Sequence, residues 1–165
     1  MSVTGVSAST VVSVKRETPE ALILVSIWDR MASQLLAPLA DAPNGSFAVL
    51  GNHDDDRDMP AALSRRGFTV LKDQRTTISV RHETLDVVGI RFWTRRMEHV
   101  TQALKGAGPT TMLLAHDPRR LTQAAQLDVP LVLSGHTHGG QMLLPGVGAI
   151  AAREDYKVMF AACDT

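Results

Sequence analysis

Short apolar runs alternate with amphipathic segments along most of this 165-residue chain. The apolar runs have the length of buried strands, and the amphipathic segments place apolar residues at the three- and four-residue spacing of a helix. Strands that alternate with helices predict an α/β fold with helix-covered sheet. The predicted strands are 22–27, 47–50, 68–71, 76–81, 85–90, 110–115 and 130–134, and the predicted helices are 29–40, 59–66, 95–105 and 118–127.

The composition fits one globular domain and excludes several classes of protein. Hydrophobic residues make up 44% of the chain, and 17 basic side chains balance 17 acidic ones, unlike a disordered chain or a nucleic-acid scaffold. No apolar run reaches the roughly 18–20 residues of a membrane span. The one cysteine excludes an internal disulfide, and the first residues do not resemble a secretory signal, so we expect a cytoplasmic protein. No helix or strand is predicted in residues 1–18, and residues 19–165 are predicted to form a single α/β domain.

Three of the predicted strands end in polar motifs that contain histidine. The strand 47–50 runs into Gly-Asn-His-Asp, the strand 110–115 into His-Asp-Pro, and the strand 130–134 into Gly-His-Thr-His-Gly-Gly-Gln. Ligands of open α/β sheets bind beyond the carboxyl ends of the strands. Four of the six histidines therefore fall where a site is expected.

The groups in these motifs form a donor set for divalent metal ions. His136 and His138 are two positions apart, so an extended backbone directs both rings to the same side, toward one ion or two adjacent ions. Asn52 adds an amide oxygen and His116 a third imidazole, a combination that suits Zn, Mn, Fe or Ni. Each motif alone also fits an ordinary turn, so the prediction of a metal site depends on their convergence.

The motifs GNHD, AHDP and GHTHGGQ, in this order, resemble those of the calcineurin-like metallophosphoesterases. GHTHGGQ followed by Pro145 resembles the YkuE/YaeI-like bacterial branch, and the resemblance covers residues 19 to 150. It implies a two-sheet sandwich flanked by helices, with a dinuclear metal centre at the strand ends. It also implies hydrolysis of phosphomonoesters, phosphodiesters or pyrophosphates, with a phosphorylated small molecule or a lipid-linked nucleotide as substrate.

The resemblance assigns ligands to two divalent ions. Asn52, His116 and His136 match the ligands of one ion, and His138 matches a ligand of the other. The family bridges the two ions with the Asp of a Gly-Asp motif, which is missing after the strand 22–27. Asp29 is the nearest candidate for this bridge, with a helix cap as its alternative role.

The resemblance also assigns the acid–base groups. His53 matches the imidazole that stabilises the transition state or protonates the leaving oxygen, and Asp54 matches the carboxylate that orients it. An imidazole held by a carboxylate is suited to donating a proton near neutral pH.

Two departures from the family pattern leave alternatives open. The chain contains no Asp-x-His motif, which supplies two ligands of the first ion in the family, so that site is depleted and can be empty. We therefore expect a domain shortened at both ends, with weak or no activity. The alternatives are a non-catalytic remnant that binds at most one ion, and an interaction domain that forms homo-oligomers through an uncovered sheet edge.

Overall fold

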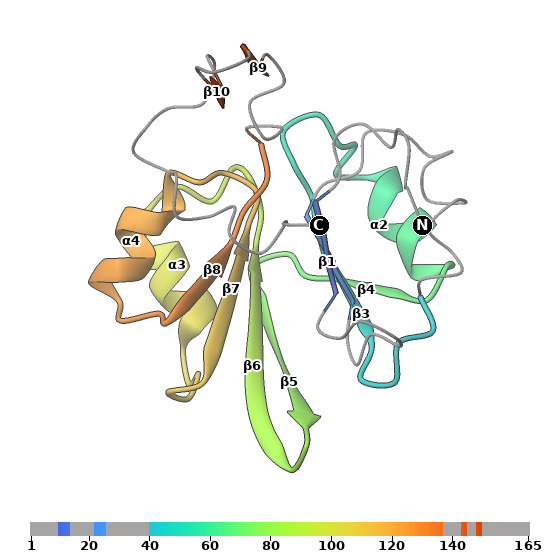
Figure 1. The fold of residues 1–165 in the computed structure, drawn as a ribbon, viewed down its shortest axis with the longest axis horizontal. Coiled ribbons are helices and arrows are strands. Elements are labelled where there is room, and N and C mark those ends of the chain that lie inside the picture. Colours follow the sequence, from blue (N-terminus) through green and yellow to red (C-terminus); the bar gives the residue numbers. More distant parts are fainter. Residues whose placement is uncertain (1–9, 14–21, 26–39, 137–142, 145–147, 150–165) are drawn as a thin grey trace.

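Two four-stranded sheets face each other at the centre of the molecule (Figure 1). The computed structural model describes residues 10–13, 22–25, 40–136, 143–144 and 148–149. The first sheet has the order β1 (Thr10–Ser13), β2 (Leu22–Val25), β3 (Ser46–Val49) and β4 (Phe68–Val70). The second has the order β5 (Gln74–Val80), β6 (Glu83–Ile90), β7 (Thr111–Ala115) and β8 (Leu131–Leu133).

Helices cover the outer faces of both sheets (Figure 1). Helix α2 (Asp58–Ser64) lies on the first sheet, and α3 (Met97–Leu104) and α4 (Arg120–Gln126) lie on the second. The short strands β9 (Leu143–Leu144) and β10 (Gly148–Ala149) pair with each other. This arrangement confirms the prediction of a two-sheet α/β sandwich flanked by helices.

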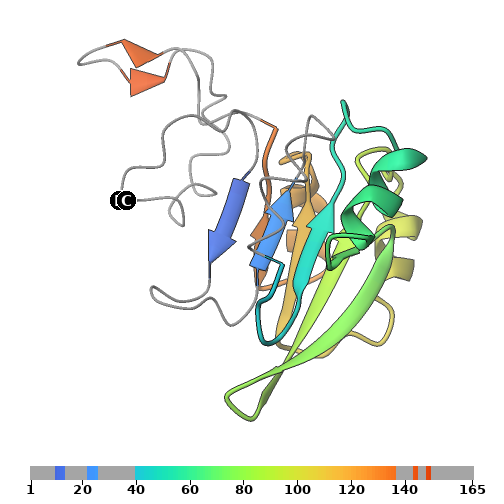
Figure 2. The same ribbon diagram turned by 90° about the vertical axis from the view of Figure 1, so that its right-hand side faces the viewer.

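Each sheet contains three parallel strands and one antiparallel strand at an edge. β2, β3 and β4 are parallel and β1 is antiparallel to β2, as the arrows of β1, β2 and β3 show in Figure 2. β6, β7 and β8 are likewise parallel, and β5 is antiparallel to β6. The carboxyl ends of the parallel strands in one sheet therefore lie at one edge, where the polar motifs that follow these strands were expected to meet.

The apolar core has three layers. Between the sheets, residues of β3 pack against residues of β6, β7 and β8; outside them, α2 covers the first sheet, and α3 and α4 cover the second. All residues of β3 and β7 are buried, which explains why their sequences are continuous apolar runs and do not alternate. The layer between the sheets consists of Phe47, Val49, Leu71, Val87, Met112, Leu114 and Leu133.

The two sheets approach each other closely at Gly89. It lies on β6 and faces the first sheet, and a Cβ added there would lie 2.7 Å from Val49 Cγ1 and closer still to Leu71 Cβ. Real Cβ atoms are not found at such separations. The two sheets can therefore take their observed spacing only because this residue has no side chain.

Most predicted elements are confirmed, with ends that agree to within two residues. The helix predicted at 29–40 lies almost wholly outside the described residues. β1 was not predicted; it pairs antiparallel with β2 and lies at the edge of the first sheet. Homo-oligomerisation through an uncovered sheet edge stays a prediction. In the part of the chain that the structure describes, no helix has the length and apolar character to cross a membrane.

Asp86 ties three segments of the second sheet together. Its carboxylate is 8% exposed and accepts hydrogen bonds from Arg75 Nη1 (3.0 Å) and Thr77 Oγ1 on β5 and from the Gly108 amide (2.7 Å) before β7. Burial alone raises the pKa of Asp86, but these donors and the charge of Arg75 outweigh it and lower the pKa below its ordinary value of 3.8.

Gly89→Ala is expected to destabilise the fold because the new methyl group forces β6 away from Val49 and Leu71. Overpacking of this kind costs about 1–3 kcal/mol. Gly108→Ala is the matched control, since a Cβ there meets Asp86 Oδ2 at 3.5 Å, an ordinary contact. Urea unfolding of both variants measures the difference, and equal stability of the two would contradict the close approach.

Asp86→Asn is expected to reduce the acid sensitivity of the fold. The pKa of Asp86 is lower in the folded than in the unfolded protein, so the ionised carboxylate stabilises the fold. This stabilisation is complete above pH 3.8, the ordinary pKa, and is lost as the pH falls through the pKa of the folded state. The wild type should therefore lose more free energy of unfolding between pH 7 and pH 3 than the variant. Asp41→Asn, at an exposed position, is the control and should behave as wild type.

Candidate metal centre

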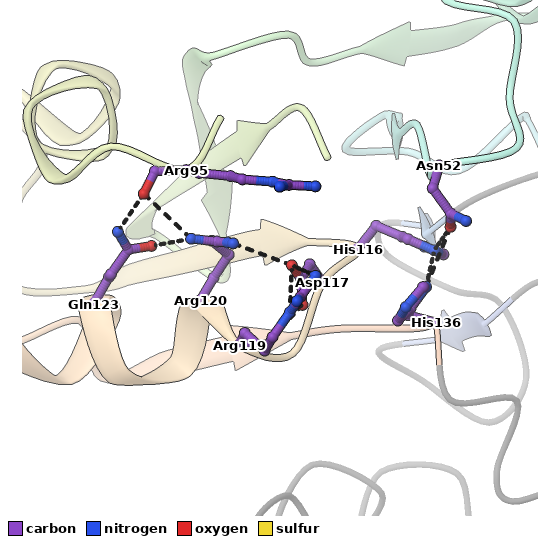
Figure 3. Close-up of polar contacts among 8 residues, drawn as sticks. All are labelled: Asn52, Arg95, His116, Asp117, Arg119, Arg120, Gln123 and His136. Carbon is purple, nitrogen blue, oxygen red and sulfur yellow. Dashed lines mark hydrogen bonds and ion pairs between the residues drawn. The ribbon is translucent and has the colours of Figure 1, made fainter. Parts of the chain in front are cut away.

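The polar side chains of three loops meet at one end of the sandwich (Figure 3). Asn52 follows β3, His116 follows β7 and His136 follows β8. His116 Nε2 lies 3.1 Å from Asn52 Oδ1, and His136 Nδ1 lies 3.2 Å from both of these atoms. The structure thus brings together the three residues that the resemblance assigns to one ion.

The fold places these side chains through its strand order and its loops. β7 and β8 are parallel neighbours, so His116 and His136 leave the sheet side by side, and the Gly135 amide donates to the His116 carbonyl oxygen (3.2 Å). His136 has a φ of +70°, a left-handed conformation that is uncommon for residues other than glycine and that clusters at functional sites. Asn52 reaches them from the other sheet.

The spacing of the three donor atoms fits a bound transition metal. In a tetrahedral site with bonds of about 2.0–2.1 Å, neighbouring ligand atoms are about 3.3 Å apart. Two imidazole nitrogens and an amide oxygen at 3.1–3.2 Å are close to this arrangement. A divalent cation attracts the lone pairs of all three atoms at once, whereas two imidazole nitrogens can share only one proton between them.

The described part of the donor set is electrically neutral. Within the residues that the structure describes, no group of three or more His, Cys, Asp and Glu side chains is placed so that it could hold a metal ion. The third donor of this centre is the amide oxygen of Asn52. The two further predicted ligands, Asp29 and His138, lie outside the described residues.

Phe92 forms an apolar wall beside the two imidazoles. Its ring centroid lies 5.8 Å from that of His116 and 5.6 Å from that of His136, and it is largely buried just after β6. Phe92 was not among the residues predicted to form the site. The signal was present, because the strand 85–90 also ends at this edge of the sheet and runs into Arg-Phe-Trp-Thr-Arg-Arg.

Asp117 lies next to His116 but belongs to a separate network of arginines (Figure 3). Its carboxylate, 1% exposed, accepts from the Arg119 backbone (3.0 Å), from Arg119 Nε (2.9 Å) and from Arg120 Nη2 (3.1 Å). Burial raises the pKa of Asp117, but the hydrogen bonds from the two arginines outweigh it and bring the pKa down to about 2. Asp117 thus anchors the loop that carries His116.

The loop of Asn52 is closed by Asp54. Asp54 Oδ2 accepts a hydrogen bond from the Gly51 amide (2.6 Å), which fixes the turn that carries Asn52 and His53. His53, the residue after Asn52, is exposed. The orientation of His53 by Asp54 stays a prediction.

Comparison with known proteins shows several metallophosphoesterases among the relatives. The chain is 34% identical to phosphodiesterase YaeI of Escherichia coli over 126 residues, and this alignment covers 70% of this chain and 44% of that protein. It is 34% identical over 149 residues to an uncharacterised metallophosphoesterase of Aquifex aeolicus, covering 80% and 56% of the two chains. A cattle (Bos taurus) transmembrane protein with a metallophosphoesterase domain is 29% identical over 174 residues, or 89% of this chain and 39% of that protein.

The chain thus spans about half the length of the curated relatives it matches. No family model matches it, and no solved structure does. The chain belongs to the calcineurin-like metallophosphoesterase family.

Proposed function

We propose that this chain carries the centre of a metal-dependent phosphoester hydrolase, in which Asn52, His116 and His136 hold one divalent ion. The observation that supports it most is the triangle of donor atoms at 3.1–3.2 Å, built from loops that follow β3, β7 and β8. The relatives named as metallophosphoesterases and as a phosphodiesterase point to the same chemistry. The substrate class is a phosphomonoester, phosphodiester or pyrophosphate.

The residues around the triangle have separate tasks in this proposal. When bound, a divalent ion polarises a phosphoryl oxygen and offsets the charge that develops on it. His53, exposed on the same turn as Asn52, donates a proton to the leaving oxygen. Asp54 keeps that turn closed through the Gly51 amide, and Phe92 excludes water from one side of the imidazoles.

A second ion belongs to the proposal in its fuller form. His138 would contribute to that site and Asp29 would bridge the two ions. The alternative is a remnant that binds one ion and does not turn over substrate.

Replacing a group that only hydrogen-bonds to a metal ligand typically weakens metal binding by about 10- to 100-fold. His116 is proposed to be a ligand itself, so His116→Ala is expected to weaken binding of Mn²⁺ or Zn²⁺ by at least about this factor. His99→Ala, which removes an exposed histidine of α3, should bind as wild type. Isothermal titration with each metal measures both variants. Asn52→Asp should tighten binding because a carboxylate adds charge, and a misfolded variant cannot show this gain. No metal binding by the wild type would contradict the proposal.

His53→Ala is expected to lower the rate of hydrolysis of bis(p-nitrophenyl) phosphate by about 10²- to 10⁴-fold, the usual contribution of a general acid. Metal affinity should stay at the wild-type value, since His53 is outside the triangle. Steady-state kinetics in Mn²⁺, with metal titrations of the same samples, separate the two effects. Metal binding without any turnover by the wild type would identify the one-ion remnant.

A further inference from the structure

The described residues supply no carboxylate partner for the guanidinium of Arg95, in contrast to three other arginines of this half of the chain. Arg91 pairs with Asp73, and Arg119 and Arg120 pair with Asp117. Among the described residues, no carboxylate lies within ion-pair distance of the Arg95 guanidinium, and the side chain is exposed. As far as the described residues show, this cation is therefore available to an anion from solution.

Two aromatic rings hold this guanidinium in place. Arg95 Cζ lies 5.7 Å from the ring centroid of Phe92 and 5.4 Å from that of Trp93, and the two rings meet edge to face with centroids 4.8 Å apart. Stacking on aromatic faces orients the planar guanidinium while it leaves its edge donors open.

The backbone of Arg95 is fixed as well. Its carbonyl oxygen accepts hydrogen bonds from Gln123 Nε2 (2.8 Å) and Arg120 Nη1 (3.3 Å) of α4. Arg120 is in turn bound to Asp117, the neighbour of His116. The position of Arg95 is therefore tied to the same network that anchors the loop of the candidate metal ligand.

The ring of Phe92 connects Arg95 with the candidate metal centre. Phe92, which contacts the Arg95 guanidinium on one side, contacts the rings of both His116 and His136 on another. In Figure 3 the side chain of Arg95 extends toward the side of the site on which His116 and Asn52 lie. This placement is outside the donor triangle and suits a group next to the reacting phosphoryl group.

We propose that Arg95 binds a second anionic group of the substrate and makes the site selective for pyrophosphate esters, or for phosphodiesters with a further negative charge, over esters with neutral substituents. This inference rests on the proposed function of the metal centre. Arg binds phosphate oxygens through two parallel N–H donors, which a stacked and oriented guanidinium provides without further ordering. Trp93, 63% exposed, lies beside the same subsite.

The test compares binding of inorganic pyrophosphate and orthophosphate to the metal-loaded chain by isothermal titration. The wild type should bind pyrophosphate more tightly. Arg95→Gln should lose about 10-fold or more of this preference, the range of a charge-assisted hydrogen bond, with orthophosphate affinity unchanged. Arg96→Gln removes the same charge from the neighbouring exposed residue and should keep the preference. Equal metal concentrations in all samples make chelation by pyrophosphate the same for every variant.

A second readout follows the aromatic rings. Pyrophosphate should change the tryptophan fluorescence of the wild type, and this change should be absent in Trp93→Phe and in Arg95→Gln. If Arg95→Gln keeps the preference for pyrophosphate, or if the wild type binds both anions equally, the inference is overturned while the metal centre stands. If the metal titrations show no bound ion, the proposed function itself fails.

Discussion

The close packing of the two sheets is the constraint on which the candidate site depends. Asn52 comes from the first sheet, whereas His116 and His136 come from the second, so the donor triangle exists only when the sheets have their observed spacing. Gly89 permits that spacing, and the apolar layer between the sheets holds it. The stability of the core and the geometry of the site are therefore two results of the same contact.

Around the triangle, charged and aromatic groups fix what the packing brings together. Asp117 is held by two arginines and anchors the loop of His116, and Asp54 closes the turn of Asn52. Phe92 links the two imidazoles to the guanidinium of Arg95. The described part of the site thus has neutral donor groups at its centre and the guanidinium of Arg95 at its margin.

The strands and the donor residues that short sequence patterns specify were predicted correctly. Continuous apolar runs predicted β3 and β7, and the polar residues after them predicted which side chains would meet. β1 was missed because its four residues, Thr10–Ser13, show no period that separates a strand from a loop. Arg95 was missed for another reason: its role depends on contacts with Phe92 and on bonds from α4, which no spacing in the sequence reveals.

The measurement that tests the metal centre most directly is anomalous diffraction from crystals of the protein grown with Zn²⁺. The account predicts an anomalous peak within bonding distance of Asn52 Oδ1, His116 Nε2 and His136 Nδ1, with the three side chains arranged around it. A zinc ion bound elsewhere, with these three atoms still in contact with one another, would contradict it.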